Sequence, residues 1–107
     1  MTFEQKKHLH YQLLALTGEV DLHNSPQVRK QLLDIVESGS SVIVDFSALS
    51  YIDSSGIATL VETYNLAKNK QLSLTIVGAT GAPLQVMELT HLNKVFPMIN
   101  SLDEIKG

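Results

Sequence analysis

The chain has 107 residues, 44% of them hydrophobic, which predicts one domain over residues 1–107 with a single modest core. The formal net charge is −3 and Lys and Arg do not cluster, so the basic surface that nucleic-acid binding requires is missing. The absence of cysteine excludes disulfides and thiolate metal sites and is typical of a cytoplasmic protein. The polar N-terminus lacks the apolar core of a signal peptide, and no run of about 18 apolar residues predicts insertion into a membrane.

The first third of the chain predicts a strand followed by a helix. The apolar run from Tyr11 to Leu16 predicts a strand that stops at a glycine turn, with a shorter strand before it. The next element is a helix, in which Ser25 caps the first turn, Pro26 takes the first helical position and Gly39 ends the last turn. Its apolar face consists of Val28, Leu32, Ile35 and Val36.

The middle of the chain predicts the central strand and a second helix. The strand from Val42 to Asp45 is continuously β-branched in its first three residues, as expected when both faces of a strand are covered. We therefore place it at the centre of a mixed sheet of four or five strands. The helix that follows ends near Lys68 to Lys70. Its apolar stripe consists of Ile57, Leu60, Val61 and Tyr64.

The last third repeats the alternation of strand and helix. The segment LSLTIVG, residues 72–78, predicts a strand that stops at Gly78. Pro83 then opens a third helix that runs to about Thr90, and the tail, residues 101–107, forms a short last helix. Strands that alternate with helices indicate the α/β class, with one sheet flanked by helices.

The sequence DSSG, Asp53 to Gly56, lies where the central strand gives way to the second helix. The first N–H groups of a helix lack partners and its dipole favours negative charge, so Ser54 or Ser55 would be exposed in a site that tolerates an anion. Gly56 has no Cβ, which permits close approach by a protein or by a nucleotide phosphate. A purely structural interpretation is equally available, in which Asp53 is a helix cap, Asp21 forms a turn and Ile57 belongs to the core.

Catalysis and metal binding have little support in the sequence. The G-x-S-x-G turn of serine hydrolases, the Walker A motif and the G-x-G-x-x-G turn are all absent. His8 and His10 alternate along the predicted first strand without further ligands, while His23 and His91 lie next to predicted helices. We therefore expect a binding protein with no catalytic residues, no metal and no cofactor.

Three segments resemble the STAS domain of bacterial anti-sigma factor antagonists. They are GEVDLHNSPQVRKQL at residues 18–32, VIVDFSALSYIDSSGIATLVETY at 42–64 and LTIVGATGAPLQVMELTHLNKVFPM at 74–98. The most specific pieces are G-E-V-D at Gly18 to Asp21, the DSSG sequence and L-x-x-V-F at Leu92 to Phe96. Each piece alone is common, but their order and spacing together are typical of this family.

The resemblance implies a protein that regulates transcription by partner switching. Its partner is an ATP-dependent anti-sigma factor serine kinase, which phosphorylates the serine after the aspartate, here Ser54, and a PP2C-type phosphatase restores the hydroxyl. The unphosphorylated antagonist binds the kinase and frees a sigma factor or another client. The implied partner-binding residues are Asp21, Asp53, Ser54, Ser55, Gly56 and Ile57. Ser55 is the rival acceptor, and only the family pattern ranks Ser54 above it.

Two other roles are known for domains that look like this one. Small cytoplasmic STAS subunits of ABC-type lipid transporters bind the ATPase assembly and need no phosphoserine. Ala58 stands where the antagonists often carry a second glycine, which leaves this alternative open. A domain from the cytoplasmic tail of an anion transporter is disfavoured, because a chain that starts at Met1 and holds the whole pattern is expected to be an independent unit.

Overall fold

The computed structural model describes residues 2–105, whose five strands form one mixed sheet in the order β1-β2-β3-β4-β5. β1 pairs antiparallel with β2, and every other neighbouring pair is parallel. The strands are β1 (Thr2–His8), β2 (Tyr11–Val20), β3 (Ser41–Ile52), β4 (Leu74–Val77) and β5 (Met98–Ile99). The predicted α/β class is confirmed, and the predicted central strand lies in β3, the middle strand of the sheet.

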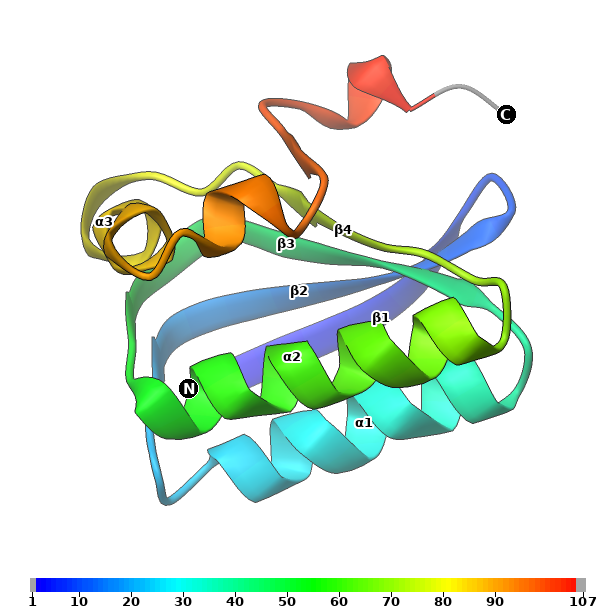
Figure 1. The fold of residues 1–107 in the computed structure, drawn as a ribbon, viewed down its shortest axis with the longest axis horizontal. Coiled ribbons are helices and arrows are strands. Elements are labelled where there is room, and N and C mark those ends of the chain that lie inside the picture. The colour runs from blue at the N-terminus through cyan, green and yellow to red at the C-terminus, as the bar shows by residue number, and fades with distance from the viewer. Residues whose placement is uncertain (1, 106–107) are drawn as a thin grey trace.

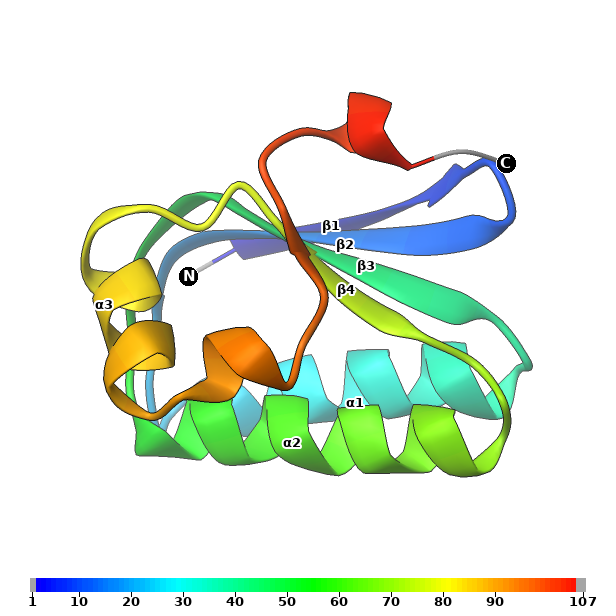
Figure 2. The ribbon, with the colours of Figure 1, turned by 45° about the horizontal axis from the view of Figure 1, so that its top comes forward.

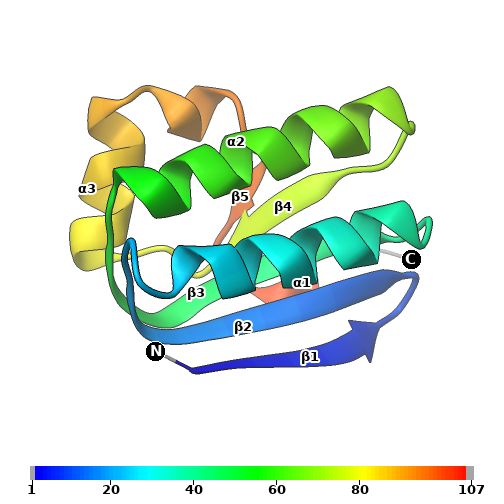
Figure 3. The ribbon, with the colours of Figure 1, turned by 90° about the horizontal axis from the view of Figure 1, so that it is seen from below.

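The helices are distributed unequally over the two faces of the sheet. They are α1 (Ser25–Glu37), α2 (Ser54–Asn69) and α3 (Gly81–Leu89), with short 3-10 helices η1 (Leu92–Lys94) and η2 (Leu102–Glu104). α1 and α2 lie side by side on one face of the sheet, as Figure 3 shows. α3 lies near the end of the sheet at which α2 begins (Figure 1), and η2 lies over the opposite face (Figure 2).

Alternating side chains of the strands supply both parts of the core. The side chains that face α1 and α2 include Leu14, Leu16, Val42, Val44 and Ile76, all fully buried. On the other face, Leu13, Ile43 and Val77 form a smaller buried cluster, against which Leu102 and Ile105 of the C-terminal segment pack. β3 is therefore covered on both faces, which is the reason its apolar run is continuous instead of alternating.

β2 is longer than predicted, and β1 ends earlier than predicted. β2 continues past the expected stop to Val20, because Gly18, with φ of 90°, takes part in an irregular pairing with β3 and does not end the strand. His8 ends β1, whereas His10 lies in the turn between the strands, so the expectation that both alternate along one strand was wrong for His10.

Three helix ends also differ from the prediction. The N-cap of α1 is Asn24, and Ser25 is the first helical residue and is buried, so Ser25 was wrongly assigned as the cap. α3 begins at Gly81 and not at Pro83. Of the helix predicted for residues 101–107, the part up to residue 105 forms the 3-10 turn η2, and residues 106–107 lie outside the described residues. The glycine end of α1 is confirmed, since Gly39 has φ of 95°, which favours glycine. Among residues 2–105, no helix has the length and apolar character needed to cross a bilayer.

Candidate functional site

The loops that carry the predicted site residues start where β2 and β3 end side by side. The backbone N–H of Asp53 donates to the carbonyl oxygen of Val20 at 3.1 Å, which joins the two strand ends. α1 and α2 begin at this same end of the sheet (Figure 1). Parallel pairing therefore brings Asp21 and Asp53, 32 positions apart in the sequence, to one edge of the domain.

Asp53 is the N-cap of α2. One of its carboxylate oxygens, Oδ1, accepts hydrogen bonds from the backbone N–H groups of Ser55 and Gly56, at 2.9 and 3.2 Å, and from the Ser55 hydroxyl at 2.5 Å. The Ser55 hydroxyl is the main reason that the pKa of Asp53 lies below its usual value, with smaller contributions from the backbone N–H groups of Gly56, Ser55 and Leu22. The predicted cap is confirmed, and its carboxylate is charged at neutral pH.

The two serines of the site have different surroundings. Ser55 is half-buried and its hydroxyl donates to Asp53. Ser54 is the first residue of α2 and is exposed, and no hydrogen bond of its hydroxyl is found within residues 2–105. The Ser54 hydroxyl is therefore free to meet another molecule, whereas the Ser55 hydroxyl is already bound to Asp53.

Asp21 organises the loop between β2 and α1. Its Oδ1 accepts from the backbone N–H of His23 at 2.9 Å and from that of Asn24 at 3.3 Å. The Asn24 side chain accepts from the N–H of Asp21 at 2.8 Å and donates to the carbonyl of Glu19 at 2.9 Å. These reciprocal bonds fix the loop beside the start of α2, and the expectation that Asp21 forms a turn is confirmed.

Gly56 and Ile57 face the interior of the domain. Gly56 is buried, and a Cβ at this position would lie 2.6 Å from Cγ1 of Ile52 and 2.9 Å from Cγ1 of Val20. Internal packing thus accounts for the glycine, since it lets α2 rest on the ends of β2 and β3, whereas the sequence had pointed to approach by another molecule. Ile57 is half-buried and packs against the main core.

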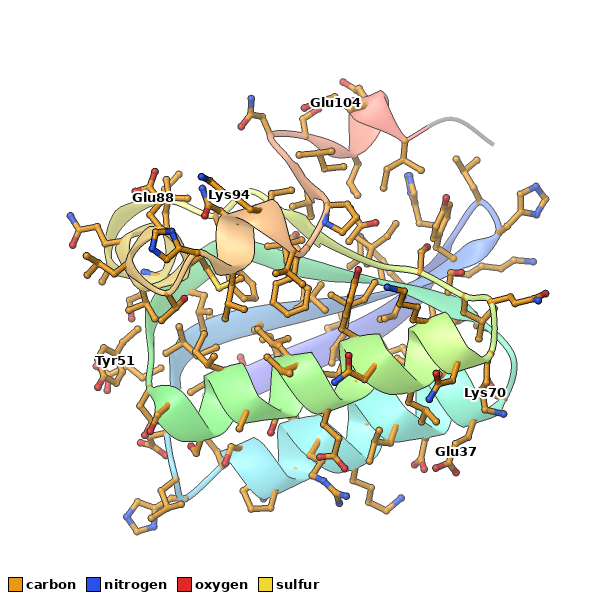
Figure 4. All side chains as sticks on the ribbon, in the orientation of Figure 1. Glu37, Tyr51, Lys70, Glu88, Lys94 and Glu104 are labelled. Atoms are coloured by element: carbon orange, nitrogen blue, oxygen red, sulfur yellow. The ribbon has the colours of Figure 1, made fainter. Side chains whose placement is uncertain are left out.

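Two exposed apolar side chains that the sequence had not singled out belong to the segments next to the start of α2. Leu22, in the loop after β2, is 73% exposed, and Tyr51, near the end of β3, is 44% exposed. Figure 4 shows Tyr51 pointing away from the molecule at the end where α2 begins. Their positions in the sequence could have pointed to them. Leu22 is an aliphatic residue inside a turn, Tyr51 is an aromatic residue three positions before Ser54, and neither belongs to the apolar pattern of the core.

The described part of the chain, residues 2–105, contains no group of three His, Asp or Glu side chains arranged to hold a metal ion. No pocket is found on the surface of the same residues. The chemical features of this end of the domain are therefore a hydroxyl, nearby carboxylates and exposed apolar side chains on a surface without a cavity.

These features define a small α/β domain with an exposed serine at the start of a helix that follows the central strand. The family model described as "STAS domain" matches residues 2–105, and the chain belongs to the STAS domain family. The resemblance noted in the sequence is therefore confirmed at the level of the family.

Named relatives and solved structures agree with this assignment. An anti-sigma-B factor antagonist of Listeria monocytogenes is 27% identical over 96 residues, covering 88% of this chain and 83% of the relative. The structure of an anti-sigma factor antagonist from Mycobacterium paratuberculosis has a TM-score of 0.84 at 24% identity, covering 96% of this chain and 88% of that one. The Bacillus cell fate determinant SpoIIAA in its phosphorylated form has a TM-score of 0.77 at 20% identity, covering 96% and 95%.

Proposed function

We propose that this protein is an anti-sigma factor antagonist whose binding is switched by phosphorylation of Ser54. The observation that carries the proposal is the difference between the two serines: the Ser54 hydroxyl is exposed, while that of Ser55 is held by Asp53. The names of the relatives supply the class of partner, an anti-sigma factor. In this proposal the unphosphorylated chain binds an anti-sigma factor serine kinase in the cytoplasm and releases the kinase's sigma factor or other client.

The switch follows from the chemistry of the modified oxygen. The Ser54 oxygen attacks the γ-phosphorus of ATP bound to the kinase, the bond to the β-phosphate oxygen breaks, ADP leaves and the hydroxyl proton passes to a base of the kinase. The phosphate adds about 1.5 to 2 negative charges at pH 7. Hydrolysis by a PP2C-type phosphatase would restore the hydroxyl. The chain itself acts by binding and contributes no catalytic group.

The geometry supports a change of surface charge without a change of fold. Asp53 already accepts from the backbone N–H groups of Ser55 and Gly56, so the start of α2 does not need a phosphate as its cap. A phosphate on Ser54 would be repelled by the Asp53 carboxylate and turn toward solvent. The similarity of this unmodified chain to the phosphorylated form of SpoIIAA supports a fold that survives the modification.

The test combines intact mass with binding measurements. We expect the protein isolated from its native cells to carry one phosphate under some growth conditions, and the cognate kinase with ATP to place the same phosphate in vitro. Ser54→Ala should abolish the phosphate but keep binding, whereas Ser55→Ala, the matched control, should still be phosphorylated. Ser54→Asp should weaken binding about thirtyfold, since an unmatched charge in an interface costs on the order of 2 kcal/mol or more.

Two results together would contradict the proposal. They are the absence of a phosphorylated form under every growth condition and unchanged partner binding by Ser54→Asp. In that case the chain would act by assembly alone, as expected for a STAS subunit of an ABC-type transporter bound to its ATPase.

A further inference from the structure

We propose that Leu22 and Tyr51, both exposed at the end of the domain where α2 begins, are the apolar anchors with which this chain holds its kinase, and that the kinase surface that receives them is basic. This inference rests on the proposed function and adds to it the residues that provide binding energy. Exposed aromatic side chains that become fully buried often dominate the affinity of protein interfaces, and an exposed aliphatic side chain adds buried apolar area.

Leu22 is exposed although its backbone is fixed. Its side chain is 73% exposed, a larger fraction than for Leu9 or Tyr51. The residues on both sides of it belong to the hydrogen-bonded loop formed by Asp21 and Asn24. A leucine on a rigid loop loses little backbone entropy when a partner covers it, so this position can contribute its apolar area efficiently.

Tyr51 approaches the site from the neighbouring strand. It lies three positions before Ser54, pairs across the sheet with Glu19 and is 44% exposed. Figure 4 shows its ring directed away from the domain, between α3 and the start of α2. Tyrosine combines a large apolar ring with a hydroxyl that can keep a hydrogen bond, which suits a surface that is hydrated in the free protein and buried in a complex.

The charge around these two side chains identifies the chemistry of the occupant. Residues 17–25 and 50–57, which include the ends of β2 and β3 and the starts of α1 and α2, contain no Lys or Arg. The same segments contain the acidic residues Glu19, Asp21 and Asp53. Arg29, the first basic residue after this region, is paired with Glu62 at 2.7 Å. An acidic surface with apolar anchors is complementary to a basic surface with an apolar depression.

A basic rim is compatible with release after phosphorylation. The acidic residues at the edge of the site attract the rim of the kinase, while Ser54 must face the phosphates of the bound nucleotide for transfer to occur. Those phosphates repel a phosphoserine at the centre of the interface, where charges are poorly screened by water. The acidic residues at the edge are therefore attracted to the kinase, while the phosphate on Ser54 at the centre is repelled, so phosphorylation can release the chain although the rim is basic.

The first experiment is photocrosslinking in the native cells. A benzophenone amino acid replaces Leu22, Tyr51 or, as the matched control, Leu9, which is 48% exposed in the β1–β2 turn at the opposite end of the sheet (Figure 1). We expect positions 22 and 51 to crosslink to the same protein and position 9 not to do so. The additional substitution Ser54→Asp should reduce both crosslinks.

The second experiment titrates the crosslinked protein, purified, with substituted chains. Leu22→Ser and Tyr51→Ser should each weaken binding about tenfold or more, and Leu9→Ser should leave it unchanged. Unfolding is not expected to interfere, because all three side chains are exposed. Binding of the unsubstituted chain should weaken as the salt concentration rises, since opposite charges are screened.

The possible failures are distinguishable from a failure of the proposed function. If Ser54 is phosphorylated by the kinase but Leu22→Ser and Tyr51→Ser bind as tightly as the unsubstituted chain, the anchors are wrong and the proposed function stands. Crosslinks at position 9 alone, or no crosslinks at positions 22 and 51, would also overturn the assignment of Leu22 and Tyr51 as anchors. A partner without kinase activity, together with a chain that never carries phosphate, would overturn the proposed function and the occupant named here.

Discussion

The Asp53 carboxylate holds the hydroxyl of Ser55 at 2.5 Å, and this bond separates the roles of two adjacent serines. Ser55 and Asp53 together complete the first turn of α2, so substitution of either residue should affect stability. Ser54 is exposed and takes no part in the cap, so its substitution should affect only what binds at this surface.

Removal of the cap should destabilise the fold by a moderate amount. Asp53→Ala leaves the N–H groups of Ser55 and Gly56 without their acceptor, and loss of an N-cap costs about 1 kcal/mol. Urea unfolding should show this decrease in the free energy of unfolding. Asp103→Ala removes an exposed carboxylate that caps no helix and should change stability little. Equal stability of the two variants would show that the cap of α2 is dispensable.

Acid should weaken the fold in part through Asp53. Its pKa is depressed in the folded state, mainly by the Ser55 hydroxyl, so the charged form stabilises the fold above the unfolded pKa of about 3.9. That contribution disappears as the pH falls through the lower, folded pKa. Asn is also a good cap but does not titrate, so Asp53→Asn should flatten the pH dependence of the unfolding free energy below about pH 4. Parallel pH profiles of the two proteins would argue against this contribution.

Gly56→Ala should destabilise the protein even though alanine favours helices. The added methyl would meet Ile52 at 2.6 Å and Val20 at 2.9 Å, and such overpacking costs about 1 to 3 kcal/mol. The better helix propensity of alanine returns at most about 1 kcal/mol. A double-mutant cycle with Ile52→Ala, which deletes the nearest atoms, should show that Gly56→Ala costs less in that background. Additive effects would exclude the steric explanation.

Gln71→Gly should stabilise the protein, in contrast to the usual effect of glycine. Gln71 follows the C-terminal end of α2 with φ of 62°, a left-handed conformation that is unfavourable for a residue with a side chain. Relief of that strain exceeds the extra freedom of glycine in the unfolded state, for a net gain of about 0.5 kcal/mol. Thermal or urea unfolding measures the change. The control Gln85→Gly, at an exposed position inside α3, should lose about 0.5 to 1 kcal/mol.

Local patterns in the sequence predicted most of the elements in their order and placed the DSSG sequence at the start of the second helix. The continuous apolar run that includes Val42 and Ile43 predicted the central strand, because a strand covered on both faces needs no polar side. Asp53 was predicted as the cap of α2, because capping depends on a few neighbouring residues. β5 was missed, because its two residues, Met98 and Ile99, are defined by pairing with β4 and carry no periodic pattern of their own.

The roles of individual residues at the site depended on contacts between distant segments. Ser54 and Ser55 are the same residue type in the sequence, and only the direction of the Ser55 hydroxyl toward Asp53 distinguishes them. Gly56 was expected to admit another molecule, but the ends of β2 and β3 occupy the space beside it. Leu22 and Tyr51 lie at the same end of the sheet because β2 and β3 are parallel and end together. The sequence by itself determined the elements, since these follow from neighbouring residues, and the tertiary structure decided which side chains remain exposed, since burial depends on residues far apart in the chain.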